Sequence, residues 1–585
     1  MKKEWSLDGL YKGFDDPEFA KDLEKVENVI IKFQYYVKQL DRGLPKDIIE
    51  QGITLLEEQR DLFEKLFCFA NLKQSVNTKD DRSVAYIEKL SSKKSDLTKP
   101  ITKFKSYVAE VDNLVEVIAS SKLLTEYKYF LLNLKRDSKY MLSEEVEEVL
   151  AKLDISGGSS WADLQGFLTA SAKGKIHGKE LTLTELRNLA YEDSQRVRKA
   201  AYKAELDCYS QIDNSVAFAL NSIKLQVLTE CKLRGFSTPL EETLYRARMK
   251  KETLDALLQA IDEYLPKFWE YLKIKGKALG HKRGLPWYDL FAPMGSCTKK
   301  YTIQDAKEYL LGVFEPFSED LAQMVRKAFE EQWIDFPSKE GKVGGAFCEN
   351  IHVLKESRIL TNYDENFGAV LTLAHELGHA YHNHTLSQHR SLNTDYSMPV
   401  AETASTFQEN LVLNAAIDKV QDEKVRLALI ENELQEVTQI ICDIYSRYLF
   451  ETKVFEEREE SFMFPEKLCE FMLEAQKKAY GDGLDEEYLH PYMWVCKSHY
   501  YSSDESFYNF PYAFGGLFSR GLYLKYKEEG EAFVKQYKKL LAATSVMDVE
   551  EVANIVGVDL TDVDFWRKAL DSYVVEIRLF KKMVE

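Results

Sequence analysis

The stretch His375-Glu376-Leu377-Gly378-His379 constrains the fold most strongly, because it lies inside an apolar run, residues 367–381, whose pattern predicts a helix. Histidines four residues apart lie on one helix face, one turn apart, so their imidazoles can converge on one ion. Neutral imidazole is a good Zn²⁺ ligand, and a catalytic zinc keeps its fourth position open for water. Glu376, beside the first histidine, could take a proton from that water as it attacks a carbonyl. The pattern therefore predicts a helix that carries part of a zinc site, although a motif of this length can also match by chance.

A third ligand is expected from a second helix. A loop-like segment, residues 387–399, precedes a helix-like run, residues 400–413, whose first acidic residue is Glu402. A glutamate from that helix would complete the two-histidine, one-glutamate set of a catalytic zinc site. The longer scheme H-E-x-x-H-x-x-G-x-x-H fails, because its glycine and third histidine positions are His382 and Thr385. Spacing leaves a second interpretation of Glu402 open, an acid in the first turn that the helix dipole favours.

Charge and composition exclude several kinds of partner. The chain of 585 residues has a net charge of -18 at pH 7, with 78 basic and 96 acidic side chains interspersed. Such a chain, without a basic patch, is not expected to bind nucleic acid. No signal peptide and no membrane-span-length run is visible, and the eight scattered cysteines suit reduced thiols. A cytoplasmic location without a membrane partner is therefore expected, and the sequence leaves the oligomeric state open.

The pattern along the chain predicts a mainly α fold. Residues 1–190 read as an N-terminal helical region, and residues 191–585 form a catalytic region that carries the zinc motif. Strand-like material is confined to a short hairpin at residues 173–183 and to residues 351–354 and 357–361, just before the motif. One small sheet packed against the zinc helix is therefore expected.

Several boundaries around the motif are also predicted. Residues 362–364 supply N-cap candidates for the zinc helix, and His384 and His389 are expected in the loop after it. Residues 422–459 read as one long amphipathic helix, and the chain is expected to stay helical from Glu402 to its end.

A glycine-rich segment precedes the expected sheet. It consists of Gly344, Gly345, Ala346 and Phe347. An exposed strand edge here could pair with the backbone of an extended peptide, and glycine would allow that backbone to approach closely. The alternative is a bulged turn that binds nothing.

With these motifs in view, the chain resembles the M3 family of zinc metallopeptidases, and within it the oligoendopeptidase F branch. The resemblance rests on the zinc motif as it continues to His382, on residues 400–407 around Glu402, on the glycine-rich segment, and on His499 followed by residues 507–517. It covers nearly the whole chain. The resemblance implies a two-lobed helical metallopeptidase with a deep central cleft, whose wall includes the N-terminal region. It favours one Zn²⁺ per chain, bound by His375, His379 and Glu402.

The activity implied by the resemblance is a metalloendopeptidase that cuts internal bonds of short unstructured peptides, with Glu376 as the general base. His499, Tyr508 and Tyr512 match the family positions that stabilise the oxyanion. Tyr500 and Tyr501 compete for that role, and aromatic core packing is the alternative for each.

Support around the ligands is expected from nearby polar side chains. Thr406 stands where thermolysin-like peptidases carry an acid that orients a zinc histidine, so Glu409 or Ser405 is expected to act instead. His382 is assigned to the shell around the ligands or to the cleft wall, because a fourth ligand would close the site.

Two other functions stay open at this point. One is a carboxypeptidase or peptidyl dipeptidase, which would need a cation to hold the terminal carboxylate. The other is a non-catalytic helical peptide-binding protein with a structural zinc, against which the intact Glu376 argues, since a structural site needs no general base.

Overall fold

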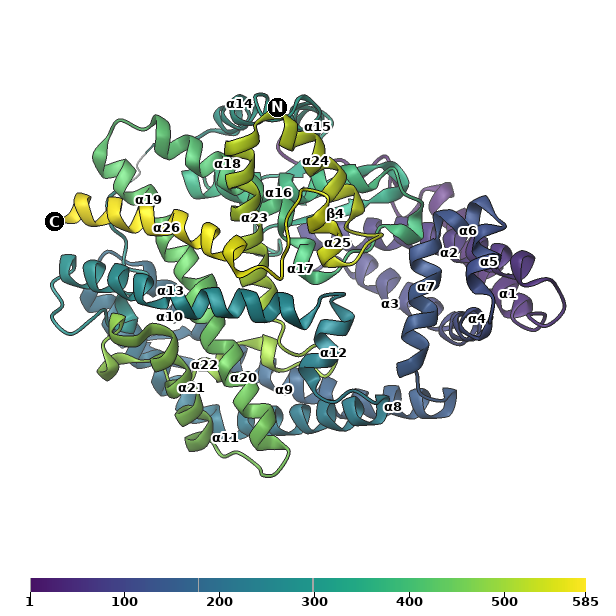
Figure 1. Ribbon diagram of the computed structural model, residues 1–585, viewed down its shortest axis with the longest axis horizontal. Coiled ribbons are helices and arrows are strands. Elements are labelled where there is room, and N and C mark those ends of the chain that lie inside the picture. The colour runs from purple at the N-terminus through teal and green to yellow at the C-terminus, as the bar shows by residue number, and fades with distance from the viewer. Residues whose placement is uncertain (1, 177, 297–298) are drawn as a thin grey trace.

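The computed structural model describes residues 2–176, 178–296 and 299–585, and it is mainly helical (Figure 1). Helices hold 72% of the chain and the described strands form two small sheets, which confirms the predicted fold class. The N-terminal helices gather at one end of the molecule, and the C-terminal helix α26 (Val563–Val584) lies at the opposite end. Within the described residues, no helix is both long enough and apolar enough to cross a bilayer.

The N-terminal helices have a hydrophobic core of their own. They are α1 (Pro17–Tyr36), α2 (Pro45–Val76), α3 (Asp81–Ser95), α4 (Thr98–Glu110), α5 (Leu114–Ala119), α6 (Lys122–Glu126) and α7 (Lys128–Asp137). Buried side chains between Trp5 and Leu131 form this core, and Ile351, Leu360 and Leu392 from later in the chain join it. The N-terminal helices therefore pack directly against the small sheet. The predicted boundary at residue 190 stays a prediction.

The middle of the chain connects the two hydrophobic cores. Its elements are α8 (Glu144–Ser156), α9 (Gly158–Ser171), β1 (Lys173–Ile176), β2 (Lys179–Thr182), α10 (Leu183–Asn188), α11 (Gln195–Arg234), α12 (Pro239–Arg246), α13 (Lys251–Ala278), α14 (Ile303–Phe314) and α15 (Glu319–Glu330). The predicted hairpin is present as the antiparallel pair β1–β2, which makes a second sheet in addition to the one expected. His177 lies outside the described residues.

The three-stranded sheet lies where the sequence predicts it, although one strand begins earlier. Its strands are β3 (Ile334–Asp335), β4 (Phe347–Ile351) and β5 (Glu356–Leu360), in the order β3-β5-β4. Residues 351–354, predicted as a strand, mostly form a 3₁₀ turn that reverses the chain between β4 and β5. Both β4 and β5 contact α16 (Phe367–Leu386), the helix that carries the histidine motif. The predicted packing of sheet on helix is confirmed, with β4 at the edge.

Two details of α16 differ from the prediction. The N-cap is Asn366 rather than residues 362–364, because its side-chain oxygen accepts the amide hydrogen of Ala369 at 2.8 Å. The helix also continues to Leu386, so His384 is helical and only His389 lies in the turn that follows.

Helices dominate the rest of the chain, but one stretch is irregular. The elements are α17 (Met398–Ala401), α18 (Thr403–Lys419), α19 (Glu423–Thr438), a π turn (Gln439–Asp443), α20 (Ile444–Arg458), α21 (Pro465–Tyr480), α22 (Met493–Cys496), α23 (Phe510–Glu529), α24 (Glu531–Ala543), α25 (Val549–Asn554) and α26. The long helix predicted over 422–459 is present, interrupted by the π turn. The prediction that the chain stays helical to its C-terminus was wrong. Residues 481–509 hold only short helical turns, since Gly481, Gly483 and Pro491 interrupt regular helix there.

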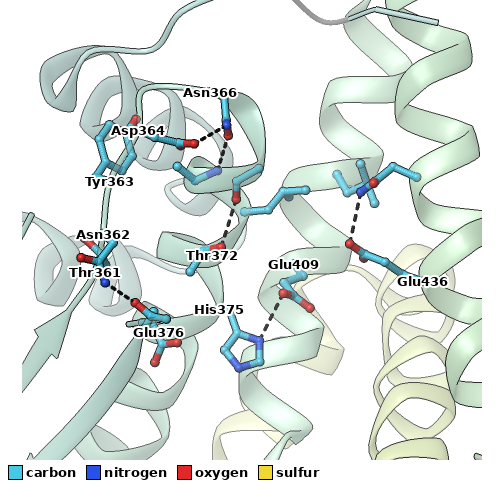
Figure 2. Close-up of a pocket in the computed structure, with 17 residues that line it drawn as sticks. Thr361, Asn362, Tyr363, Asp364, Asn366, Thr372, His375, Glu376, Glu409 and Glu436 are labelled. Atoms are coloured by element: carbon cyan, nitrogen blue, oxygen red, sulfur yellow. Dashed lines mark hydrogen bonds and ion pairs between the residues drawn. The ribbon is translucent and has the colours of Figure 1, made fainter. Parts of the chain in front are cut away.

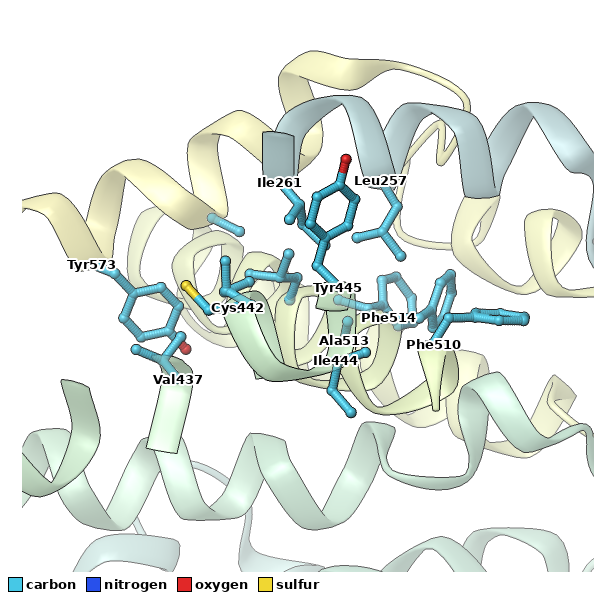
Figure 3. Packing of buried hydrophobic residues seen from close by; sticks show 14 of the residues in the cluster. Leu257, Ile261, Val437, Cys442, Ile444, Tyr445, Phe510, Ala513, Phe514 and Tyr573 are labelled. Atoms are coloured by element: carbon cyan, nitrogen blue, oxygen red, sulfur yellow. The ribbon is translucent and has the colours of Figure 1, made fainter. Parts of the chain in front are cut away.

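A larger core fixes the helices behind the histidine motif. Leu257 and Ile261 of α13 meet Tyr445 of α20 and Phe514 of α23, and Tyr573 of α26 packs close by (Figure 3). Because α23 also contacts α18, this core sets the position of the segment that contains Glu402.

Candidate metal centre

Three side chains from two segments converge on one point. His375 and His379 lie one turn apart on α16, and Glu402 lies at the junction of α17 and α18. The Nε2 atoms of the two histidines are 3.1 Å apart, and Glu402 Oε2 lies 3.3 Å from His375 Nε2 and 3.4 Å from His379 Nε2. Within the described residues, this is the one group of three His, Cys, Asp or Glu side chains arranged to hold a metal ion.

The separations fit a tetrahedral ion. Ligands bound to Zn²⁺ at about 2.0–2.1 Å in a tetrahedron lie about 3.3–3.4 Å from one another. The side chains of the three residues keep between 19% and 29% of their surface exposed, so an ion and a further ligand can reach them. The donor set and its spacing therefore fit a catalytic rather than a closed structural site.

Two glycines allow Glu402 to lie so close to the histidines. A methyl group at Gly378 of α16 would lie 2.5 Å from Ser405 Cα, a backbone atom that cannot move aside alone. A methyl group at Gly515 of α23 would lie 3.1 Å from Glu402 Cβ. Glu402 is the N-cap residue of α18, but its side chain makes no cap hydrogen bond to that helix. Close approach of α16, α18 and α23 places the carboxylate instead.

Polar neighbours orient the ligands. Glu409 Oε1 lies 3.2 Å from His375 Nδ1, which leaves Nε2 of that ring facing the ligand cluster. Ser405 Oγ donates to Glu402 Oε2 at 2.7 Å. Burial opposes ionisation of Glu402, but the hydrogen bond from His379, the charge of His375 and the Ser405 hydroxyl outweigh it and lower its pKa to about 2. Both neighbours named from the sequence thus contact a ligand.

Glu376 and a cavity adjoin the ligand cluster. The Glu376 side chain is mostly buried, and burial raises the pKa of its carboxyl group. A cavity of about 710 Å³ is lined by both His375 and Glu376, with Glu409 beside His375 and Glu436 farther off on α19 (Figure 2). A water or carbonyl group that reaches the cluster through this cavity would lie next to Glu376. This arrangement suits hydrolysis of a bound peptide chain.

Comparison with known proteins places the chain among peptidases. The sequence profile of Peptidase family M3 matches residues 188–572, and the profile named Oligopeptidase F matches residues 110–173. The chain belongs to peptidase family M3. Membership of this family, with its oligoendopeptidase F relatives, makes the chain a metalloendopeptidase that acts on oligopeptides.

Relatives of this M3 peptidase match it over nearly its whole length. Oligopeptidase PepF of Bacillus subtilis is 24% identical over 95% of this chain and 83% of its own. An oligoendopeptidase F homolog of Lactococcus lactis is 26% identical over 100% of this chain and 98% of its own. Among solved structures, a protein from Chlamydophila abortus has a TM-score of 0.83 at 18% identity, covering 99% and 98% of the two chains. Oligoendopeptidase-F from Enterococcus faecium has a TM-score of 0.72 at 20% identity, covering 97% and 99%.

In this M3 peptidase the glycine-rich segment divides between the cavity and the core. Gly345 and Ala346 line the cavity, and the Gly345 carbonyl accepts the side-chain amide of Asn362 at 2.9 Å. Gly344 is exposed beside them, whereas Phe347 begins β4 and packs against Trp5, with ring centroids 6.4 Å apart.

The aromatic candidates of the irregular stretch form one group beside Glu402. His499 stacks on Tyr508 with centroids 5.3 Å apart and meets the edge of Tyr512 at 6.0 Å. All three are partly exposed. Tyr508 follows Phe507, whose φ of 54° is unusual for a side-chain-bearing residue and marks local strain. The carboxylate of Glu402 adds to the burial that raises the pKa of both tyrosines.

Three other candidates lie in the core. Tyr500 is fully buried against Phe450, and the Tyr501 hydroxyl donates to the Trp494 carbonyl at 2.8 Å, so neither competes for the oxyanion. His382 is 0% exposed and does not line a cleft; burial lowers its pKa to about 3.

A tyrosine that the sequence did not single out holds His382 in place. The ring of Tyr396 stacks on the imidazole, and Nε2 of His382 lies 2.7 Å from Thr544 Oγ1. Tyr396 lies in the loop before α17, where no local pattern marks it.

Proposed function

We propose that this protein is a zinc endopeptidase that hydrolyses internal bonds of short unstructured peptides. The observation that carries the proposal is the cluster of His375, His379 and Glu402, whose donor atoms lie 3.1 to 3.4 Å apart beside Glu376 and the cavity. Its seven described free cysteines suit a cytoplasmic location.

The chemistry divides between the ion and the chain. Zn²⁺, when bound by these residues, supplies a Lewis acid that lowers the pKa of a water and polarises the scissile carbonyl. Glu376 takes the proton of the attacking water and delivers it to the leaving amine. Burial raises the pKa of its carboxyl group above that of an exposed glutamate.

The aromatic group completes the reaction site. Tyr508, Tyr512 and His499 lie together beside Glu402, and a hydroxyl or ring N–H from this group stabilises the oxyanion of the tetrahedral intermediate. Burial and then the charges of Arg447 and Lys497 lower the pKa of His499 to about 4, so its imidazole is neutral at pH 7. A neutral ring can still donate one hydrogen bond.

The edge of the small sheet positions the substrate. Strand β4 pairs only with β5 among the described strands, and Gly345 and Ala346 lead into it from the cavity wall. A methyl group at Gly344 or Gly345 would meet nothing within 4 Å, so a peptide backbone has room to approach. An extended peptide pairs with this edge and brings its scissile bond to the metal ligands.

The test is cleavage of internally quenched peptides of about four to thirty residues, half of them blocked at both ends. We expect internal cuts in the blocked short peptides. Glu376→Gln should lower kcat by about 10²- to 10⁴-fold, because it removes the general base. Metal-stripped protein should be inactive and should recover with Zn²⁺.

The zinc content of Glu376→Gln, measured by atomic emission, separates loss of the base from loss of the ion. Unchanged zinc with lost activity supports the proposed role. Cuts only at free termini would indicate an exopeptidase, and full activity in Glu376→Gln would sink the mechanism.

A further inference from the structure

A second cavity, of about 550 Å³, lies beside the aromatic group and is rich in cations. It is lined by residues of α10, α11, the π turn, α20 and the segment after α22. Its cations are Arg187, Arg198, Arg447 and Lys497, and its one acid is Glu205. Neither the zinc cluster nor the proposed base uses any of these side chains.

Two of the cations are already neutralised. Arg198 donates to Asp289 at 2.8 Å, and Arg447 pairs with Asp443, one turn earlier in the π turn. Both pairs are buried, and the first joins α11 to the segment that contains Asp289. They leave Arg187 and Lys497 as the charges available to a ligand.

The remaining donors are incompletely paired. Lys497 makes no ion pair or hydrogen bond through its ammonium group within the described residues, and burial lowers its pKa. Arg187 lies 3.6 Å from Glu205, but that carboxylate also receives His490 at 3.4 Å and the Tyr209 hydroxyl at 3.0 Å. Gln439 Nε2, in the π turn, is buried without a partner. A buried amide donor without a partner, such as Gln439 Nε2, costs free energy unless a ligand accepts from it.

Residues that line the cation-rich cavity lie next to residues that line the metal-site cavity. Glu436 lines the first cavity and Gln439 the second, and they lie three residues apart along one helix face. Tyr191 of the second cavity is close enough to Glu436 that the carboxylate adds to the burial that raises its pKa. Lys497 also lies two residues before His499 in the chain. A peptide bound at the metal ligands can therefore extend along this face into the second cavity.

We propose that Lys497, Arg187 and Gln439 form a subsite for a carboxylate at the end of the bound peptide, and this assignment rests on the proposed peptidase function. The ligand is the C-terminal carboxylate of the substrate or an acidic side chain next to that end. Two cations and a buried amide donor match the charge and the acceptor atoms of such a group. The subsite accounts for Lys497 and Gln439 Nε2, which have no partner among the described residues, and for Arg187, which shares Glu205 with two other donors.

The experiment compares kcat/KM for quenched peptides that differ only at the C-terminus, as free acid or as amide, with the N-terminus blocked. We expect the acid to be cleaved about 10- to 100-fold better, from hydrogen bonds to a charged group. Lys497→Gln and Arg187→Gln should each bring the ratio of acid to amide kcat/KM close to one, chiefly by lowering the value for the acid. Lys497→Arg, which keeps the charge, should keep the preference.

Lys203→Gln is the matched control, since Lys203 is exposed on α11 outside the cavity, and it should leave the ratio unchanged. An amidated peptide with glutamate at its last position shows whether the bound carboxylate comes from the chain terminus or from a side chain. Restored cleavage assigns the subsite to an acidic side chain, and no restoration assigns it to the terminal carboxylate. Equal rates for acid and amide in the wild type, with the amidated glutamate peptide no better, would overturn the subsite. So would variants that lower acid and amide alike.

Binding separates this proposal from the peptidase function. Fluorescence anisotropy with labelled acid and amide peptides on zinc-loaded Glu376→Gln needs no turnover. Tighter binding of the acid, lost in the double variant Glu376→Gln/Lys497→Gln, supports the subsite even if no peptide is cut. Cleavage with equal binding of acid and amide rejects the subsite and leaves the endopeptidase standing.

Discussion

At the scale of single residues, two of the three candidate ligands make a second contact outside the cluster. His375 Nδ1 lies 3.2 Å from Glu409 Oε1, and the Ser405 hydroxyl donates to Glu402 Oε2 at 2.7 Å. Such contacts fix the tautomer and direction of a ligand before an ion arrives. Glu409 and Ser405 both lie on α18. The start of that helix therefore supplies the candidate ligand Glu402, and the helix itself supplies the carboxylate that contacts His375.

Glu409→Gln should weaken zinc binding about 10- to 100-fold, because it removes the carboxylate that orients His375. Competition with a chromophoric chelator measures the affinity. Asp418→Asn is the control, since Asp418 is exposed on the same helix and away from the ligands. Equal affinity of Glu409→Gln and wild type would remove Glu409 from the site.

Tyr508→Phe should lower kcat about 10²- to 10³-fold with little change in KM, as expected when one oxyanion donor is lost. The strained φ of 54° at Phe507 favours Tyr508 over Tyr512 as that donor. Tyr501→Phe is the control, because it removes a buried hydroxyl outside the site. It should reduce stability and leave kcat unchanged. A larger kcat loss in Tyr512→Phe than in Tyr508→Phe would reassign the donor.

At the scale of elements, the site is a crossing of helices. The histidines come from α16, the glutamate from the junction of α17 and α18, and α23 packs behind that junction. The crossing is close because Gly378 and Gly515 carry no side chain. Small residues at such crossings set the distance between helix axes.

Gly378→Ala should destabilise the fold by about 1–3 kcal/mol, because its methyl group would overlap the backbone of Ser405. The shift of α18 should also move Glu402 and weaken zinc binding. Denaturant unfolding and zinc titration measure the two effects. Gly312→Ala in α14 has open space around it and should be neutral or stabilising. If Gly378→Ala matched wild type in both assays, the close crossing would not be what places Glu402.

At the scale of the whole molecule, a buried charge cluster links α18, α19, α23 and α26 behind the site. Arg520 donates to Glu433 and Asn410 at 3.0 Å each, and it also pairs with Glu576. Burial and then the Glu576 carboxylate raise the pKa of Glu433 to about 8. The folded protein therefore keeps a proton here that the unfolded chain releases near the usual glutamate value.

This cluster predicts a pH dependence of stability. A carboxyl group whose pKa is raised on folding stabilises the fold below its unfolded pKa, and that contribution is lost as pH rises towards 8. Glu433→Gln has no such proton to lose. Calorimetry from pH 5 to pH 8 measures the Tm of both proteins. The Tm of Glu433→Gln should rise relative to that of the wild type as the pH rises. A difference that stays constant with pH would show that Glu433 titrates normally.

The sequence by itself determined the helical class and the metal helix, because these depend on local spacing. Histidines at i and i+4 in an apolar run predict both α16 and a shared ion. Glu402 and Glu409 could be named because both follow the motif closely, on the next long helix. The N-cap of α16 and the start of β4 were misplaced, since a local pattern leaves element ends open by a few residues.

Only the tertiary structure decided how distant segments meet. Tyr508 and Tyr501 both lie in the irregular stretch, and no local pattern distinguishes them. Packing nevertheless places Tyr508 beside Glu402 and buries Tyr501. Nothing local joins Arg187, Gln439 and Lys497, which come from three separate elements to one cavity. Burial and contact between remote parts of a chain follow from the packing of whole helices, and a local pattern does not encode that packing.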